Sequence, residues 1–164
     1  MSELKFFNRW SAAGIAVADP GLVRYITLEP RIIPKTGARY AGNRFHKSNV
    51  SVVERLVTKM MNSGHKAKKH FMSSGHNTGK KTLILKVVEK ALERAETQLK
   101  QNPIAILVKA VENAAPREEV IAIEYGGARY PKAVETSPLR RIDQALKYMA
   151  QGVYQKSFNK KRSA

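Results

Sequence analysis

The sequence predicts a mainly α-helical protein: a small helical bundle with a projecting two-stranded β-ribbon and an extended basic N-terminal arm. Four segments place apolar residues at helical spacing, whereas residues 118–135 alternate apolar and polar residues around a glycine pair. The first 48 residues show no sustained period. The length of 164 residues favours one domain. We therefore divide the chain into an arm (1–48), a bundle (49–157) that carries the ribbon, and a basic tail (158–164).

The charge of the chain points to nucleic acid. It has 30 Lys and Arg against 13 Asp and Glu, a net charge of +17. No acidic residue lies between Arg31 and Val53, and acids gather in the helical middle at Glu89, Glu93 and Glu96. Basic faces around a more balanced body are the electrostatic footprint of phosphate binding.

Several other classes are excluded or disfavoured by composition. The absence of cysteine excludes disulfides and thiolate metal sites. No apolar run approaches the roughly 18 residues of a membrane span, and the first ten residues have no signal-peptide core. We therefore expect a cytosolic protein.

The arm contains three prolines and several glycines, which predicts extended backbone with short turns. Phe6, Phe7 and Trp10 are expected to anchor its start. Its second half interleaves basic residues with Tyr40 and Phe45, a pattern that suits RNA because guanidinium groups and aromatic rings stack on unpaired bases. A disordered cationic tail is the alternative interpretation. The predicted RNA-binding residues of the arm are Arg31, Lys35, Arg39, Arg44 and Lys47.

A capping-box pattern from Ser51 to Glu54 predicts the start of the first helix, and Gly64 its end. Arg55 and Lys59 should lie opposite its apolar stripe, in solvent or facing phosphate. A second helix is expected over residues 82–98. The expected core positions of these two helices are Val53, Leu56, Val57, Met60, Met61, Ile84, Val87, Val88, Ala91, Leu92 and Ala95.

A third helix should begin at Asn102-Pro103 and a fourth at Ser137-Pro138, since a polar cap followed by proline suits a helix start. Four apolar stripes facing one another form a bundle. The stripes of these two helices are Ile104, Leu107, Val108, Val111, Leu139, Ile142, Leu146, Met149 and Val153.

The basic loop over residues 65–81 contains two misleading patterns. Its three histidines are irregularly spaced and lack acidic neighbours, so surface histidines are favoured over zinc ligands. GHNTGKKT has three residues between Gly75 and Gly79 where a phosphate-binding loop needs four. We expect no cofactor and no metal, but phosphate contacts from Lys66, Lys68, Lys69, Lys80 and Lys81.

The ribbon is predicted to turn at Gly126-Gly127, since glycine adopts the required positive φ cheaply. This turn places Glu124 opposite Arg129 and Ile123 opposite Tyr130. A projecting arm is favoured over a ribbon folded back on the bundle. Basic residues at a helix start oppose its dipole unless an anion binds there. We therefore expect a phosphate platform at the ribbon base, formed by Arg117, Arg140 and Arg141.

These segments resemble the universal small-subunit ribosomal protein seven family. The matching stretches are VERL (53–56), SGHNTGKK (74–81), QNPIAILVKAVENAAPREE (101–119) and GGARYPKAVETSPLRR (126–141). The arm sequence PKTGARYAGNRF (34–45) is similar to the archaeal and eukaryotic branch. Members usually continue beyond the region matching residues 148–158 into a further helix, which this sequence does not include.

The resemblance implies a structural constituent of the small ribosomal subunit that binds the 3′ major (head) domain of its rRNA and nucleates head assembly. It also implies neighbouring ribosomal proteins as partners, and a ribbon close to the exit-site tRNA and the mRNA exit path. The tip residues implied in that contact are Tyr125, Gly126, Gly127, Arg129 and Tyr130.

Two other functions fit the sequence less well. A helix-turn-helix DNA-binding regulator also suits short helices and a high positive charge, but it explains neither the ribbon nor the arm. An enzyme is disfavoured, because paired carboxylates, a nucleophile with a base, and metal-ligand spacing are all missing from the sequence. No membrane and no small-molecule substrate are expected.

Overall fold

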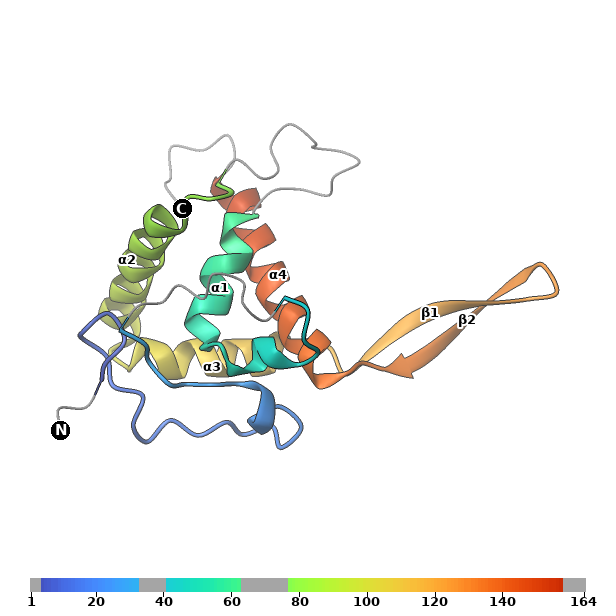
Figure 1. Ribbon diagram of the computed structural model, residues 1–164, viewed down its shortest axis with the longest axis horizontal. Coiled ribbons are helices and arrows are strands. Elements are labelled where there is room, and N and C mark those ends of the chain that lie inside the picture. Colours follow the sequence, from blue (N-terminus) through green and yellow to red (C-terminus); the bar gives the residue numbers. More distant parts are fainter. Residues whose placement is uncertain (1–3, 33–40, 63–76, 158–164) are drawn as a thin grey trace.

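The helices of the chain gather into one body from which the two strands extend as a long ribbon (Figure 1). The computed structural model describes residues 4–32, 41–62 and 77–157. The predicted fold class, mainly α with a projecting ribbon, is confirmed. The elements in order are η1 (Val23–Tyr25), η2 (His46–Asn49), α1 (Val52–Met61), α2 (Lys81–Leu99), α3 (Pro103–Ala114), β1 (Glu118–Tyr125), β2 (Ala128–Glu135) and α4 (Pro138–Ser157).

Side-chain caps start two of the helices, α1 and α3, whereas α2 begins after Lys80 without one. The Ser51 hydroxyl accepts a hydrogen bond from the Glu54 backbone N–H at 3.3 Å, which starts α1. Asn102 Oδ1 accepts from the Ile104 N–H at 3.0 Å and Pro103 follows the cap, as predicted for α3. The Glu54 carboxylate does not complete a capping box but pairs with the Lys81 ammonium, joining the starts of α1 and α2.

Each of the four α-helices in the described chain packs mainly against two of the others. α1 packs against α2 and α4, and α3 packs against the same two helices. The predicted stripe of α3 is fully confirmed, because all four of its apolar residues are at most 7% exposed. α4 contributes Ile142 and Leu146, both without exposure. The described helices include none with the length and apolar character that crossing a bilayer requires.

Some predicted core positions lie outside the core. Ala91 is exposed because α2 buries a narrow stripe, whose members are Ile84, Val88 and Leu92. Val153 is 36% exposed, since the buried face of α4 ends at Ala150.

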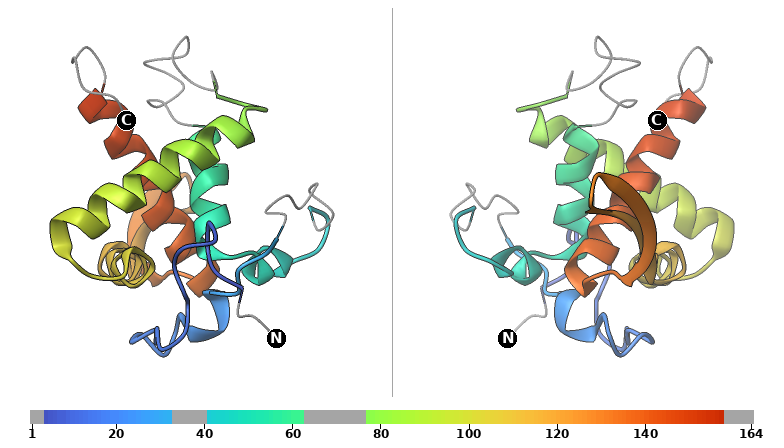
Figure 2. Two further views of the ribbon diagram at one scale, coloured as in Figure 1. Left: turned by 90° about the vertical axis from the view of Figure 1, so that its left-hand side faces the viewer. Right: turned by 90° about the vertical axis from the view of Figure 1, so that its right-hand side faces the viewer.

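The first part of the arm packs against the bundle and belongs to its core. It runs across one end of the helices in both views of Figure 2. Phe6 and Trp10, two of the three expected anchors, are 6% and 5% exposed. Leu22 and Ile26, which no periodicity indicated, join the same apolar cluster. Trp10 Nε1 donates to Glu96 at 2.9 Å, which fixes the arm to α2.

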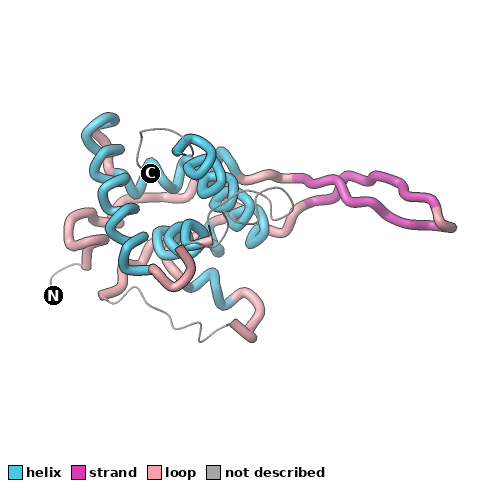
Figure 3. Tube along the Cα trace, turned by 90° about the horizontal axis from the view of Figure 1, so that it is seen from above, coloured by secondary structure: helices cyan, strands magenta, loops and turns pink. Residues whose placement is uncertain are grey.

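The ribbon has the predicted register. Glu124 pairs with Arg129 and Ile123 with Tyr130 across the two strands. Gly126 and Gly127 have φ of +57° and +77°, as the turn requires. Every residue from β1 to β2 is exposed except the half-buried pair at the base, Glu119 and Val134. Figure 3 shows the strands extending beyond the helices, so the projecting arrangement is confirmed.

Candidate nucleic-acid interface

Two adjoining hollows lie between α1, α4 and residues 41–50. The larger has a volume of about 590 Å³, and its apolar lining includes Val50 and Leu139. The smaller, about 350 Å³, lies on the α4 side, and Phe45 lines both. We call the two together the α1–α4 groove.

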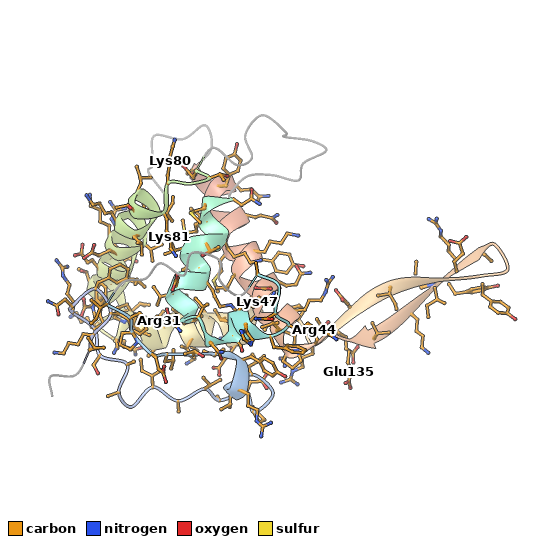
Figure 4. All side chains as sticks on the ribbon, in the orientation of Figure 1. Arg31, Arg44, Lys47, Lys80, Lys81 and Glu135 are labelled. Atoms are coloured by element: carbon orange, nitrogen blue, oxygen red, sulfur yellow. The ribbon has the colours of Figure 1, made fainter. Side chains whose placement is uncertain are left out.

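Cations dominate the walls of the α1–α4 groove. Figure 4 places two of them, Arg44 and Lys47, on the side of the bundle from which the ribbon extends. Two carboxylates, Glu54 and Asp143, are the acidic members, and Glu54 is already paired with Lys81. The solvent-accessible cations that line the groove are Arg44, Lys47, Lys59, Arg140 and Lys147.

Asp143 organises this charge. Its carboxylate pairs with Lys47, with Arg55 at 3.2 Å and with Lys59 at 3.7 Å. Burial acts to raise the pKa of Asp143, but the hydrogen bond from Lys47 and the charges of Lys59 and Arg55 outweigh it, so the pKa is lowered. Asp143 therefore holds three cations together that would otherwise repel one another.

Arg55 corrects the expectation for the outer face of α1. The sequence predicts that Arg55 lies in solvent or faces phosphate. In the structure its side chain is buried, with 6% exposed. One guanidinium nitrogen donates to the Tyr25 carbonyl at 3.1 Å and another to Asp143. Burial lowers the pKa of Arg55, and the Asp143 charge opposes that shift. A buried guanidinium with these partners joins the arm, α1 and α4.

The three arginines at the ribbon base are arranged differently from one another. Arg140 is exposed and pairs with Glu119 of β1 at 2.7 Å, and Arg117 is exposed as well. Arg141 is 9% exposed and donates to Asp19 at 2.7 Å. This hydrogen bond from Arg141 is the main reason that the pKa of Asp19 is lowered. Arg141 thus ties the arm to α4, whereas Arg117 is exposed and Arg140, although paired with Glu119, keeps 55% of its side chain exposed.

The other expected site residues lie apart from the groove. Arg31 is exposed and donates to the Asn49 carbonyl at 2.9 Å. Lys80 is exposed beside the start of α2. At the ribbon tip, Tyr125 is 81% and Tyr130 58% exposed, and Arg129 pairs with Glu124 at 3.5 Å.

Part of the predicted site falls outside the described residues. This part comprises Lys35, Arg39, Lys66, Lys68 and Lys69. The histidines at 65, 70 and 76, expected to be surface residues and not zinc ligands, lie outside the described residues as well. Within residues 4–32, 41–62 and 77–157, no group of three potential metal ligands is close enough to hold an ion.

Lys147 and Asp143 were missed as site residues, although the sequence carried a signal for them. Arg140, Asp143 and Lys147 are spaced by three and four residues on a predicted helix, which places them on one face. For Phe45, the sequence signal is its place as an aromatic residue within a basic segment of the arm.

A helical body with a basic groove and an exposed ribbon defines a structural nucleic-acid-binding protein with no recognisable catalytic centre among its described residues. Over residues 22–164 the chain matches the family described as ribosomal protein S7p/S5e, and it belongs to that family. It is therefore a structural component of the small ribosomal subunit in the cytoplasm, not an enzyme.

The chain is similar to several curated proteins from archaea. The small ribosomal subunit protein uS7 of Nanoarchaeum equitans is 48% identical over 96% of this chain and 80% of its own length. The protein of the same name from Methanococcoides burtonii is 42% identical over 98% of this chain and 80% of its own. That from Methanoregula boonei is 39% identical over 99% of this chain and 74% of its own.

Proposed function

We propose that the chain binds the 3′ major (head) domain of small-subunit rRNA, nucleates assembly of the head, and places its ribbon near the exit-site tRNA and the mRNA exit path. The observation that carries this proposal is the α1–α4 groove beside the ribbon base. There, five accessible cations lie next to the base of a ribbon whose residues are almost all exposed (Figure 4).

The groove suits RNA phosphates because its cations are held in place before binding. Asp143 and Glu119 fix Lys47, Lys59 and Arg140, so little side-chain entropy is lost when a phosphate replaces solvent. Release of condensed counterions then supplies much of the affinity. The expected contacts also include Arg117 and Lys80, along with the basic residues outside the described ranges.

The ribbon supports the second half of the proposal. A two-stranded ribbon is marginal in water, so a projecting one implies a partner that orders it. Exposed Tyr125 and Tyr130 offer stacking surfaces near the turn, and Arg129 adds a cation. Exit-site tRNA and mRNA are the RNAs that we propose for the tip.

Footprinting on intact small-subunit rRNA tests the placement. Hydroxyl-radical cleavage should be suppressed by the full chain within the 3′ major domain alone. A competition experiment separates RNA from DNA: a folded 3′ major-domain fragment should displace the protein from labelled rRNA, and duplex DNA of equal length should compete at least tenfold less well. Protection confined to another domain, or equal competition by DNA, would refute the proposal.

A further inference from the structure

An aromatic ring lies open within the α1–α4 groove. The Phe45 side chain is 49% exposed and lines both hollows. Tyr25 meets its ring at a 60° interplanar angle with the centroids 6.4 Å apart. The Arg44 guanidinium carbon lies 5.4 Å from the ring centroid. The ring is therefore braced by its neighbours and still available to a ligand.

The backbone holds Phe45 in an unfavourable conformation. Its φ of +64° lies in the left-handed region, which bulky side chains rarely adopt. Its carbonyl accepts hydrogen bonds from the Ser48 N–H at 2.9 Å and from the Ser48 hydroxyl at 2.6 Å, and these stabilise the turn. Strain that the surroundings maintain is characteristic of binding sites.

The rest of the groove is complementary to a flat ring attached to a negatively charged group. Val50 and Leu139, 6% and 9% exposed, provide apolar surface beside Phe45. The volume of about 590 Å³ is within the range of small-ligand sites. Lys59, Arg140 and Lys147 line the adjoining hollow together with the Asp143 carboxylate. Arg140 also pairs with Glu119 of β1, and its side chain remains 55% exposed. The larger hollow, with its apolar surface, therefore fits a nucleobase, and the smaller, cationic hollow fits a neighbouring phosphate.

We propose that the α1–α4 groove takes one unpaired nucleobase of the rRNA, stacked against Phe45 beside Arg44, with a neighbouring phosphate at Lys59, Arg140 and Lys147. This inference rests on the proposed function and names the kind of RNA element that the groove receives. Unpaired bases in loops and bulges stack on aromatic rings and guanidinium planes, whereas bases within a duplex present no free face.

A fluorescent ring at this position tests the stacking directly. The chain has one tryptophan, Trp10, which is 5% exposed, so wild-type emission gives a constant background. When the folded 3′ major-domain fragment is added to the Phe45→Trp variant, the extra emission should fall by more than half and its quenching by acrylamide should drop severalfold. A fully paired RNA duplex of equal length should leave the extra emission unchanged.

Affinity measurements complete the test. Phe45→Leu should weaken binding of the same fragment about tenfold without changing the salt dependence, because it removes a ring and no charge. Phe45→Tyr should bind like the wild type. Circular dichroism verifies that each variant folds. If the wild type binds but Phe45→Leu binds equally well and the indole emission stays constant, the base-stacking inference fails and the proposed function stands. If the wild type does not bind the fragment, both fail.

Discussion

Asp143 is a carboxylate that helps to build an anion-binding surface, because it positions the cations around it. It lies beside Lys47, Arg55 and Lys59, and Arg55 is buried. A buried guanidinium without a counter-charge is strongly destabilising, so Asp143 contributes to folding as well as to the arrangement of the groove.

Replacing Asp143 with Asn should lower the free energy of unfolding by about 3 kcal/mol, because the buried Arg55 charge loses its partner. Urea denaturation followed by circular dichroism measures this loss. Glu124→Gln is the matched control: its pair with Arg129 is exposed on both sides, and such pairs contribute about 0–1 kcal/mol. Equal losses in the two variants would contradict the role assigned to Asp143.

Asp143 and Asp19 also predict acid sensitivity. Both have a folded-state pKa below the ordinary value of 3.8. Their stabilising contribution is therefore complete above that value and is lost as the pH falls through the lower folded-state pKa. Unfolding measured from pH 5 to pH 2.5 should show a decline that is shallower in Asp143→Asn than in the wild type. Parallel profiles would show that the carboxylate has no such linkage.

At the scale of single elements, Asn102 joins two parts of the fold. Its Oδ1 caps α3, and its amide nitrogen donates to the Ser11 carbonyl of the arm at 2.9 Å. Because the two bonds use different ends of the side chain, their contributions can be separated by substitution.

Asn102→Ala should cost about 1–2 kcal/mol of stability, since both the cap and the link to the arm are lost. Asn102→Ser keeps a cap acceptor but is too short to reach Ser11, so it should cost roughly half as much. Thermal unfolding of the two variants provides the comparison. An identical loss in both would mean that the cap contributes nothing.

We expect the bundle to fold without the ribbon, because the core cluster contains no ribbon residue. Glu118 and Glu135 are partners in the ladder, so a two-glycine link in place of residues 119–134 can close the gap. The shortened chain should keep its free energy of unfolding within about 1 kcal/mol, because the deleted residues belong to no buried cluster. Calorimetry measures this, and a much larger loss would show that the ribbon supports the bundle.

Local chemistry made some elements predictable. The ribbon register follows from Gly126-Gly127 alone, and the starts of α1 and α3 follow from Ser51 and Asn102. The buried arginines were not predictable, because their partners are remote: Arg55 binds Asp143 88 residues away, and Arg141 binds Asp19 122 residues away. Local sequence patterns do not indicate which distant carboxylate a long cationic side chain will pair with.

At the scale of the whole molecule, internal bonds occupy many of the acids. Glu93 pairs with Arg9, Glu96 with Trp10, and the Glu112 carboxylate accepts the backbone N–H groups of residues 18 and 19. These bonds place negative charge between the arm and the helices α2 and α3. The groove between α1 and α4 is left with an excess of cations. The bonds between these glutamates and the arm therefore stabilise the fold and also leave the groove surface with a net positive charge.

The most direct test of the account is the salt dependence of binding to the 3′ major-domain fragment. A variant with Lys59→Gln, Arg140→Gln and Lys147→Gln should bind more weakly, and the slope of log affinity against log salt should shrink by about 2, as expected for the loss of two or three phosphate contacts. The matched control removes three exposed cations outside the groove, with Lys86→Gln, Lys90→Gln and Lys109→Gln, and should change the slope by less than about 0.5. If the two triple variants lose affinity and slope equally, the α1–α4 groove is not the rRNA-binding surface.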